Sequence, residues 1–579
     1  DVLAIRAVAY RHDTSGYIKN IAGTQLATNG SYNTFGGRAA DAVASVGGAE
    51  LYQNEDDIGN VTHTGGRIAA LWKPFDELSV TFQYITQDAE QDGQPFVQLN
   101  LGSYQQSVLQ VGNRIPALDG KEHGVKDDIT ITNLVADYNL GWATLLSSSA
   151  WMEEEGEALD DSSYFLGGLP LVQPFASSAD IFTQELRLVS KLEGDFQYIA
   201  GVYYEDQEYS QASPGYMTGD LTLSWLLNPV DPTNPKLGDQ FFDRTLEQLA
   251  FYGELSYDIT EQLTLTGGVR HFDYERSQHF VTTEGFGDLD ILGKVEETGT
   301  NFKANLSYQP NEDTLVYAQW AQGFRVGNAV LLPSLSGANS CDANNDGILD
   351  GTNTPIKDSF DSDSTENFEL GAKLGLLDNR LQINVAVYRI NWTDIPLVVS
   401  GGLDQTPRTC FGSVTANAGE ARSQGFEIET TYQLNQGLRI NFGGAYTNAE
   451  MTAVLPTVPF SKGDRLPSSP EVSVNLGLEY DFKLGGYASY MRGDYAYVSD
   501  FFAAAGETGG DIGLGPVAAG DYGQLNISAG IDLDKFNIEL FAHNLANSDG
   551  LTHVQVFAGR GQAYRLRPRT IGLNVSYQF

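Results

Sequence analysis

One short acidic segment has the residue types and the spacing that could bind a metal ion. Counting from Asp342, carboxylate or amide side chains stand at positions 1, 3, 5 and 9, and Gly347 at position 6 permits a sharp turn. EF-hand calcium loops begin in this way and add a backbone carbonyl at position 7. The expected Ca²⁺ ligands are Asp342, Asn344, Asp346, the Ile348 carbonyl and Asp350. Position 12 is Asn353 instead of a bidentate glutamate, which should weaken the site, and a turn without an ion stays open because these residues are common in turns.

Motifs of catalytic chemistry are not found in this sequence. The seven histidines show no paired metal spacing such as His-Glu-x-x-His. There is no nucleophile elbow, no phosphate-binding Walker loop and no dinucleotide fingerprint. The sequence therefore predicts a protein that is not an enzyme and that needs no catalytic cofactor, with Ca²⁺ as a structural ion at most.

The chain carries a large surplus of negative charge. It has 75 acidic residues against 34 Lys and Arg, which gives a net charge of −41. Nucleic acid is excluded as a partner, because binding it requires clustered cations. The surplus is compatible with a surface that faces water, metal ions or a lipopolysaccharide layer bridged by cations. Long loops that are kept in solution by their charge would give the same composition.

The elements that would position these residues are β-strands with one apolar face. In residues 570–579 apolar side chains alternate without a break with small or polar ones, and they are Ile571, Leu573, Val575, Tyr577 and Phe579. Successive side chains of a strand point to opposite faces, so one face of this segment is apolar and the other is polar. No stretch approaches the roughly twenty consecutive apolar residues of a membrane-spanning helix. Any membrane span would therefore be made by strands.

The same unit repeats along the whole chain: a strand, a short turn, a second strand and a long polar loop. Nine such hairpins and one unpaired strand at each end give an expected total of about twenty strands. Turns of about three to five residues alternate with loops of roughly fifteen to fifty, which is typical of outer-membrane barrels. We therefore predict an all-β fold, a transmembrane antiparallel β-barrel. Its short turns should lie on one rim and its long extracellular loops, 13–61, 212–245 and 326–363, on the other.

Several segments of these hairpins have a characteristic sequence. Phe182–Leu188 with Ile199–Tyr204 form one example, Leu263–Arg270 another, and Tyr317–Arg325 ends in Gly-Phe-Arg. The remaining segments are 369–373, 417–427, 463–467, 544–547 and 568–571. In this order they resemble TonB-dependent receptors, the energised nutrient importers of Gram-negative outer membranes. Val326 replaces the proline that the family has after Gly-Phe-Arg, so the following loop could leave the barrel differently.

The resemblance covers essentially the whole chain and implies that residues 1–579 are the β-barrel domain of such a receptor. Members of the family have 22 strands around an N-terminal plug, with a TonB-binding box ahead of the plug. The first strand of this chain looks like the family's third, so the plug, the box and the first two strands are expected to be absent from it. The implied partners are TonB, through the missing N-terminal region, a ferric chelate or another small nutrient, and the lipid and lipopolysaccharide of the outer membrane.

The predicted barrel suggests roles for two further sets of residues. Cys341 and Cys410 would lie on neighbouring extracellular loops in an oxidising compartment, so a disulfide is expected, with free thiols as the alternative. Arg325 would lie at the lumenal mouth, where it could bind an anionic ligand. A structural arginine that pairs with carboxylates of the barrel wall is the alternative.

The expected function is gated, active import of a scarce nutrient, and a ferric siderophore is the family's commonest cargo. Cobalamin, haem or an oligosaccharide would be the cargo of a related receptor. A passive porin, or a barrel with a purely structural role in the outer membrane, is the alternative from a different class. No residue pattern selects one cargo.

Overall fold

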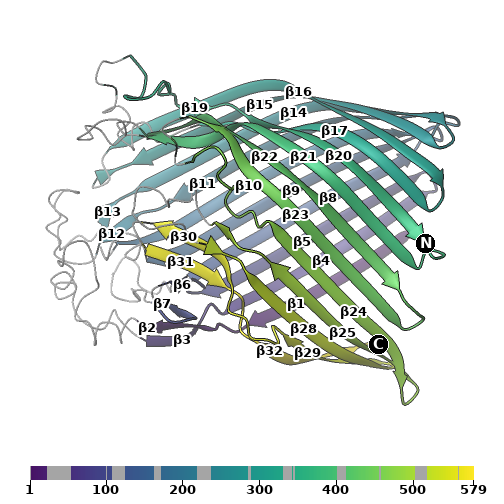
Figure 1. Cartoon of the computed structure of the whole chain (residues 1–579). Helices are drawn as coiled ribbons and strands as arrows, with labels where there is room; N and C mark the ends of the chain where they lie inside the picture. The colour runs from purple at the N-terminus through teal and green to yellow at the C-terminus, as the bar shows by residue number, and fades with distance from the viewer. Residues whose placement is uncertain are drawn as a thin grey trace.

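β-Strands account for nearly all of the regular structure in the computed structural model of the chain (Figure 1). The structure describes residues 2–21, 54–99, 101–106, 124–161, 171–217, 236–284, 288–329, 342, 346–400, 413–455, 458, 460–502, 518–557 and 560–578. No helix in these ranges is long and apolar enough to cross a membrane.

One antiparallel sheet of 22 strands dominates the fold, and two of its strands, β12 (Gly215–Met217) and β13 (Lys236–Gly238), are short extensions. The other twenty are β1 (Leu3–Thr14), β4 (Val61–Phe75), β5 (Leu78–Asp92), β8 (Gly124–Asn139), β9 (Ala143–Asp161), β10 (Leu171–Ser190), β11 (Phe196–Ala212), β14 (Gln240–Thr260), β15 (Leu263–Thr282), β16 (Leu289–Asn311), β17 (Thr314–Arg325), β20 (Asp363–Leu376), β21 (Leu381–Ser400), β22 (Ser413–Gln433), β23 (Leu438–Val454), β24 (Val472–Leu484), β25 (Tyr487–Val498), β28 (Tyr522–Leu533), β29 (Phe536–His543) and β32 (Thr570–Tyr577). Each of the twenty pairs with the next one along the chain. The predicted all-β fold with about twenty antiparallel strands is confirmed.

The connections alternate between two kinds, as the sequence predicts. The nine turns inside hairpins have two to five residues and lie together on one rim, at the right of Figure 1. Gly485 and Gly486 form one of them, with φ of 62° and 96°, and a two-residue turn with both φ values positive matches the twist of the strands that it joins. The long connections lie at the opposite end, where Figure 1 labels β12, β13 and β19. That end carries the candidate site.

Alternation along each strand separates an apolar outer face from a polar inner face. In β24, Leu478 and Tyr480 are 45% and 49% exposed, whereas the side chain of Glu479 between them is 17% exposed and pairs with its neighbours. In β32, Ile571, Leu573 and Val575 are more than half exposed. A strand that faces lipid on one side and a polar lumen on the other shows this pattern. Phe579, at the end of the predicted closing strand, lies outside the described residues.

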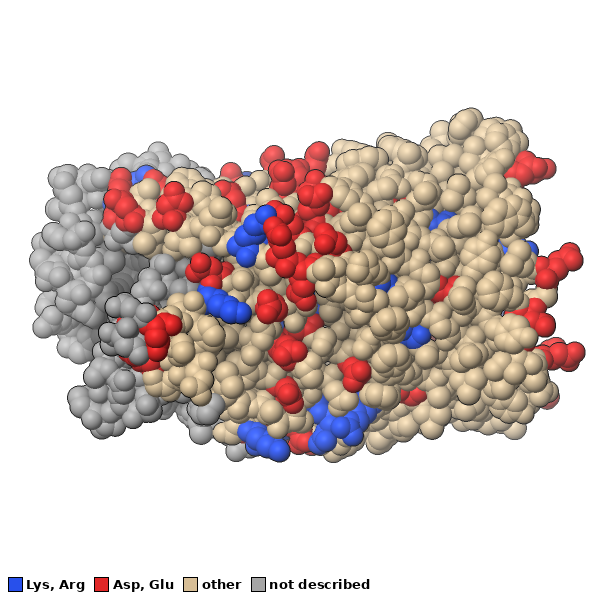
Figure 2. All heavy atoms as spheres, turned by 90° about the horizontal axis from the view of Figure 1, so that it is seen from above, with Lys and Arg blue, Asp and Glu red and all other residues tan. Residues whose placement is uncertain are grey.

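Many strands are longer than the sequence pattern predicts, most of all toward the end with the long connections. β14 begins at Gln240, inside the predicted loop 212–245, and β1 runs to Thr14 instead of ending before His12. The extra length has polar side chains on the outer face, such as Glu247 and Glu275, which lie opposite each other in the ladder. Apolar alternation stops there, although the backbone ladder continues. On the face shown in Figure 2 charged side chains gather in a band toward one end, beside a broad surface that has few charges.

Short strands tie the long connections together at this end. They are β2 (Ile18–Ile21), β3 (Asn54–Ile58), β6 (Val97–Gln98), β7 (Gln105–Gln106), β18 (Asn328–Ala329), β19 (Ser359–Phe360), β26 (Phe501–Phe502), β27 (Ala518–Ala519), β30 (Leu551–Phe557) and β31 (Arg560–Arg565). Two small cores lie among them. One contains Ile18, Val97 and Val554, and the other contains Leu349 and Val399, all at most 1% exposed. The connections are therefore packed structure at least in their described parts.

The first and last strands of the sheet each have a single neighbour. β1 pairs with β4 and β32 pairs with β29, and no ladder joins β1 to β32 in the described part of the chain. We call this pair of free edges the seam. A backbone edge in lipid leaves N–H and C=O groups without partners, which is costly enough that spanning sheets are closed. A closed barrel requires both edges to be paired, and the described ladders do not pair them with each other.

Candidate functional site at the mouth of the barrel

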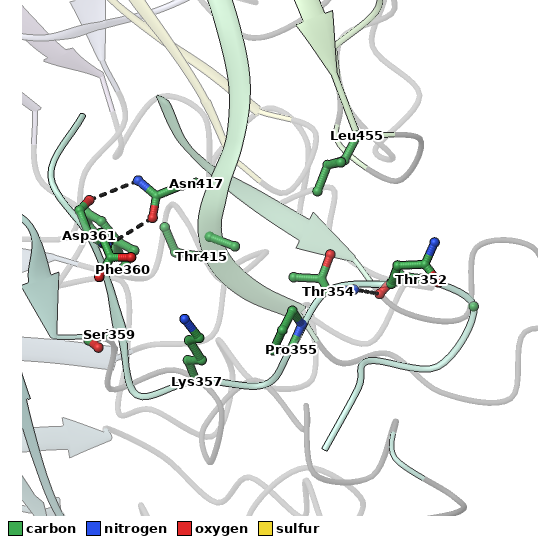
Figure 3. Close-up of a pocket in the computed structure, with 13 residues that line it drawn as sticks. Thr352, Thr354, Pro355, Lys357, Ser359, Phe360, Asp361, Thr415, Asn417 and Leu455 are labelled. Atoms are coloured by element: carbon green, nitrogen blue, oxygen red, sulfur yellow. Dashed lines mark hydrogen bonds between the residues drawn. The ribbon is translucent and has the colours of Figure 1, made fainter. Parts of the chain in front are cut away.

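A cavity of about 440 Å³ lies among the long connections, and we call it the mouth pocket. It lies between the segment 351–361, the start of β22 and the end of β23 (Figure 3). Its lining residues are Gly351, Thr352, Asn353, Thr354, Pro355, Lys357, Ser359, Phe360, Asp361, Thr415, Ala416, Asn417 and Leu455. Ligand sites commonly have volumes of about 300 to 1,000 Å³.

A tight loop with an apolar anchor holds one wall of the mouth pocket. Leu349 is fully buried against Val399 and Val414, so the chain just before the pocket is fixed to β21 and β22. The Leu349 N–H donates to the Thr354 carbonyl at 2.9 Å, and the Ile356 N–H donates to the Gly347 carbonyl at 2.8 Å. These bonds fold residues 347–356 back on themselves.

Asn417 fixes the opposite wall by bridging two chain segments. Its side-chain Nδ2 donates to the backbone carbonyls of Asp361 at 2.9 Å and Asp394 at 2.7 Å, and its Oδ1 accepts from the Asp361 N–H at 2.9 Å. Figure 3 shows the contacts with Asp361. Asn417 belongs to the family-like segment 417–427, so the sequence pattern included it without indicating its role.

Hydroxyl and amide groups dominate the lining of the mouth pocket. Lys357 is the single cation among the described lining residues, and its side chain is exposed and points toward Thr415 in Figure 3. The hydroxyl of Thr354, a residue that is only 3% exposed, has no hydrogen-bond partner among the described residues. With Asp361 as a carboxylate beside this one cation, such a lining suits a polar small molecule. Sequence reasoning missed Lys357, because one lysine in a polar loop carries no spacing signal.

Arg325 ends β17 and binds the residue directly opposite on β20. Its Nε donates to Asp363 Oδ1 at 3.2 Å, and its guanidinium lies 5.6 Å from the ring centre of Trp392. Asp363 is 3% exposed and also accepts from Trp392 Nε1 at 2.9 Å. The charge of Arg325 is thus balanced within the wall, although 60% of its side chain stays exposed. Its role toward a ligand stays a prediction.

The predicted calcium segment is described in part. Asp342 accepts hydrogen bonds from the backbone N–H groups of Asp346 and Gly347, both at 2.9 Å, and Asp346 accepts one from the Ile348 N–H at 2.9 Å. These bonds bring two predicted ligands together in one turn. Asn344 lies outside the described residues, and within those residues no group of three or more His, Cys, Asp or Glu side chains is placed to bind a metal. The Ca²⁺ assignment, including Asp350, stays a prediction.

Cys341 and Cys410 both lie outside the described residues. The disulfide between them therefore stays a prediction.

A hydrogen-bonded anchor holds the segment after β17 against the inner wall. The Tyr274 hydroxyl donates to Glu297 Oε2 at 2.7 Å and accepts from the Gly327 N–H at 2.7 Å, while the Ser362 N–H donates to the same Glu297 oxygen at 3.0 Å. Burial disfavours the charge of Glu297, but the bonds from Ser362 and Tyr274 outweigh it and hold the pKa of this carboxyl below its usual value. Gly327 and Ser362, near the two ends of the connection between β17 and β20, are thus fixed to β15 and β16.

Comparison with known proteins agrees with this architecture. A family model described as "TonB dependent receptor-like, beta-barrel" matches residues 86–547, which is more than half of the chain. The chain therefore belongs to the TonB-dependent receptor family, whose members lie in the outer membrane of Gram-negative bacteria, and the predicted family and location are confirmed.

Individual relatives are outer-membrane receptors that differ in the ligand they are named for. The chain is 23% identical over 393 residues to a probable TonB-dependent siderophore receptor, PiuA of Acinetobacter baumannii, covering 62% of this chain and 48% of that protein. It is 24% identical over 359 residues to the pesticin receptor of Yersinia pestis, covering 60% and 46%. The chain thus spans about half the length of these curated relatives.

Solved structures share the fold over the whole chain. The ferric yersiniabactin uptake receptor FyuA from Yersinia pestis superposes with a TM-score of 0.75 at 17% identity, covering 100% of this chain and 76% of that one. The siderophore receptor PiuA from Acinetobacter baumannii gives 0.69 at 16% identity, covering 100% and 77%. At such identities the likeness establishes the fold alone.

Proposed function

We propose that this chain is the barrel of a receptor that imports a scarce nutrient as a metal chelate, above all a ferric siderophore. The observation that carries the proposal is a barrel of the receptor family whose outer mouth holds a structured polar pocket. The names of a siderophore receptor and a ferric yersiniabactin receptor among the similar proteins support a chelate as cargo. Binding and passage require no covalent chemistry, so the protein is not proposed to be an enzyme.

The energy source in this proposal is TonB, which would act through the N-terminal plug and TonB-binding box that the family resemblance implies. The seam supports the same view of the complete protein, since two further strands between β1 and β32 would pair both free edges and raise the count from twenty to the family's 22. A plug domain would then fill the lumen, because a barrel of this size is wide enough to leave an open channel.

The outer surface of the proposed receptor contacts lipid and lipopolysaccharide. The few charges on the broad surface in Figure 2 suit the lipid tails, and the charged band suits a layer of phosphate groups bridged by divalent cations. The acidic surplus of the chain would attract such cations.

Uptake measurements in a deletion strain test the cargo. The gene is deleted, restored on a plasmid, and uptake of ⁵⁵Fe is measured with a panel of ferric chelates at nanomolar concentration. We expect the deletion strain to lose uptake of one class of chelate and the complemented strain to regain it. Unchanged uptake of every ferric chelate would refute iron as the cargo and direct the search to another chelated metal or to haem, cobalamin or an oligosaccharide.

A variant links this uptake to the mouth pocket. Lys357→Gln removes its cation while keeping a polar side chain, and we expect a higher half-saturation concentration for the chelate with the maximal rate unchanged. Lys19→Gln is the matched control, since this exposed lysine pairs with Asp56 away from the pocket.

A further inference from the structure

Two arginines lie side by side on the inner wall above the lipid-facing belt. Arg244 on β14 and Arg276 on β15 share one face, because Arg276 is directly opposite Leu246 and Arg244 is two residues from Leu246 on the same strand. This face is the inner one, since Leu246 is 8% exposed and belongs to a buried cluster, while Glu275 and Glu247 point outward. The pair thus faces the lumen near its mouth.

Neither guanidinium has a carboxylate partner in the described part of the chain. Both Nε atoms are buried and make no hydrogen bond. Burial lowers the pKa of Arg276, and the neighbouring charge of Arg244 lowers it further. Two like charges held close together in a partly dry environment are costly unless an opposite charge joins them.

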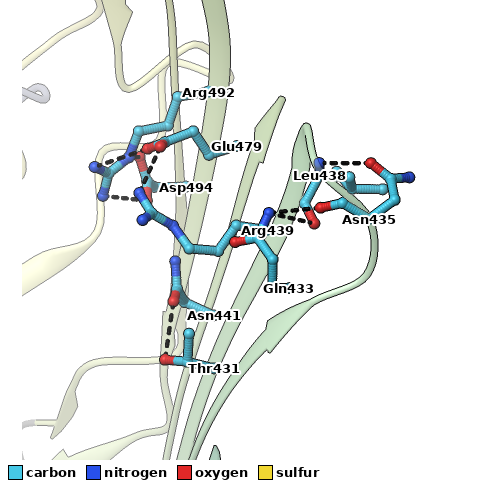
Figure 4. Close-up of polar contacts among 9 residues, drawn as sticks. All are labelled: Thr431, Gln433, Asn435, Leu438, Arg439, Asn441, Glu479, Arg492 and Asp494. Carbon is cyan, nitrogen blue, oxygen red and sulfur yellow. Dashed lines mark hydrogen bonds and ion pairs between the residues drawn. The ribbon is translucent and has the colours of Figure 1, made fainter. Parts of the chain in front are cut away.

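Other arginines of the inner wall show how this protein pairs such charges. Figure 4 shows Arg439 and Arg492 flanking Glu479, and Arg492 Nε also binds Asp494 at 2.7 Å. Strands β23, β24 and β25, which carry these residues, therefore place a carboxylate beside each of the two guanidiniums. Arg244 and Arg276 differ from Arg439 and Arg492 because the neighbouring charge of each is the other arginine and not a carboxylate.

Aromatic rings hold one of the two guanidiniums in place. The Arg244 Cζ atom lies 5.0 Å from the ring centre of Phe242 and 5.7 Å from that of Tyr209. A guanidinium fixed in this way loses little freedom on binding and offers a planar fork of donors that fits carboxylate or phenolate oxygens.

We propose that Arg244 and Arg276 form an anion-binding site in the lumen wall, and that it takes the exposed carboxylate or phenolate oxygens of an anionic metal chelate. This inference rests on the proposed function for its ligand class, and it narrows that class to chelates with a net negative charge. The site is distinct from the mouth pocket, none of whose lining residues belongs to β14 or β15.

Binding of citrate, a small polycarboxylate, tests the site in the complete receptor purified in detergent. Titration calorimetry is carried out on the wild type, on Arg244→Gln, on Arg276→Gln and on the double variant. We expect affinity to fall by about tenfold for each single variant and by more for the double variant, because each loses a charge-assisted hydrogen bond. Arg389→Gln is the control, since Arg389 is an exposed arginine of β21 that bonds Asn391, and its affinity should equal that of the wild type.

Equal citrate affinity in the wild type and the double variant, or no citrate binding by the wild type at millimolar concentration, would overturn the anion site. The migration of unheated samples in gel electrophoresis shows that each variant has a folded barrel.

Uptake measurements distinguish a failure of the anion site from a failure of the proposed function. If the wild type imports no chelate, the proposed function fails while the citrate result still reports on the site. If the double variant imports an anionic ferric chelate as well as the wild type, the site fails and the proposed function stands.

Discussion

Charge pairing distinguishes the arginines of this barrel at the scale of single residues. Arg325, Arg439 and Arg492 bind carboxylates on neighbouring strands, whereas Arg244 and Arg276 bind none in the described structure. The sequence could not reveal this difference, because the partner of Arg325 is Asp363, 38 positions away. Knowledge of the strand register, which puts the two directly opposite each other, would have found the pair.

Asp363 should hold the loop before β20 in place. In Asp363→Ala, Arg325 and Trp392 lose their shared acceptor, at a cost of about 1–3 kcal/mol. We expect faster trypsin cleavage after the exposed Lys357, measured by mass spectrometry on intact cells. Asp363→Asn keeps an acceptor for Trp392 and should give an intermediate rate. A cleavage rate in Asp363→Ala equal to that of the wild type would show that this contact does not restrain the loop.

Glu297 should make the same loop sensitive to acid. Its pKa in the folded protein lies below the ordinary value of 4.5, so its contribution to stability is present above about pH 4.5 and is lost as the pH falls through the lowered pKa. We expect the amides of Gly327 and Ser362 to exchange hydrogen faster below that pH, after correction for intrinsic rates. In the Glu297→Gln variant the amides of Gly327 and Ser362 should exchange fast at every pH. Protection that is independent of pH in the wild type would argue against an ionised Glu297 in the anchor.

At the scale of elements, the sequence predicts the hairpins well and their outer ends poorly. All nine predicted hairpins are present, because alternation is strong wherever lipid contacts one face. Above the lipid belt the outer face becomes polar and the apolar alternation is lost, so the strands β14 and β22 extend into segments that look like loops in the sequence. The mouth pocket is built from these extensions and from the loop 347–356, and its geometry depends on contacts between distant segments that no local pattern records.

The inner and outer faces of β24 should respond differently to charge. Leu478→Lys places an ammonium group in lipid and should destabilise the barrel by about 2–4 kcal/mol if this position lies near the bilayer midplane. Asn475→Lys places the same group in the lumen and should have a much smaller effect. Urea unfolding in lipid vesicles, followed by tryptophan fluorescence, measures both. Similar losses in the two variants would mean that the faces are assigned wrongly.

At the scale of the whole molecule, the seam is the place where the described strands leave two sheet edges without a paired neighbour. The residues of β1 and β32 predict strands correctly, but no pattern within them states what pairs with their free edges. Two intervening strands would separate the edges by about 14 Å, since neighbouring strands lie roughly 4.8 Å apart.

Cysteine pairs across the seam test this spacing in the complete receptor. Ile5→Cys combined with Val575→Cys should form no disulfide in the membrane, because a disulfide needs Cα atoms within about 7 Å. The pair Ile538→Cys and Val575→Cys, directly opposite each other on β29 and β32, is the positive control. A disulfide between positions 5 and 575 at the yield of the control would show that β1 and β32 pair directly and that no strands lie between them.

Energised import is the central claim about the whole molecule, and one uptake measurement tests it most directly. Uptake of the ⁵⁵Fe chelate that depends on this gene is measured with and without an uncoupler that removes the proton-motive force. We predict that the deletion and the uncoupler each abolish the same component of uptake, because TonB would transmit that force to the receptor. Uptake that is lost with the gene but unaffected by the uncoupler would contradict the account and identify a passive pore.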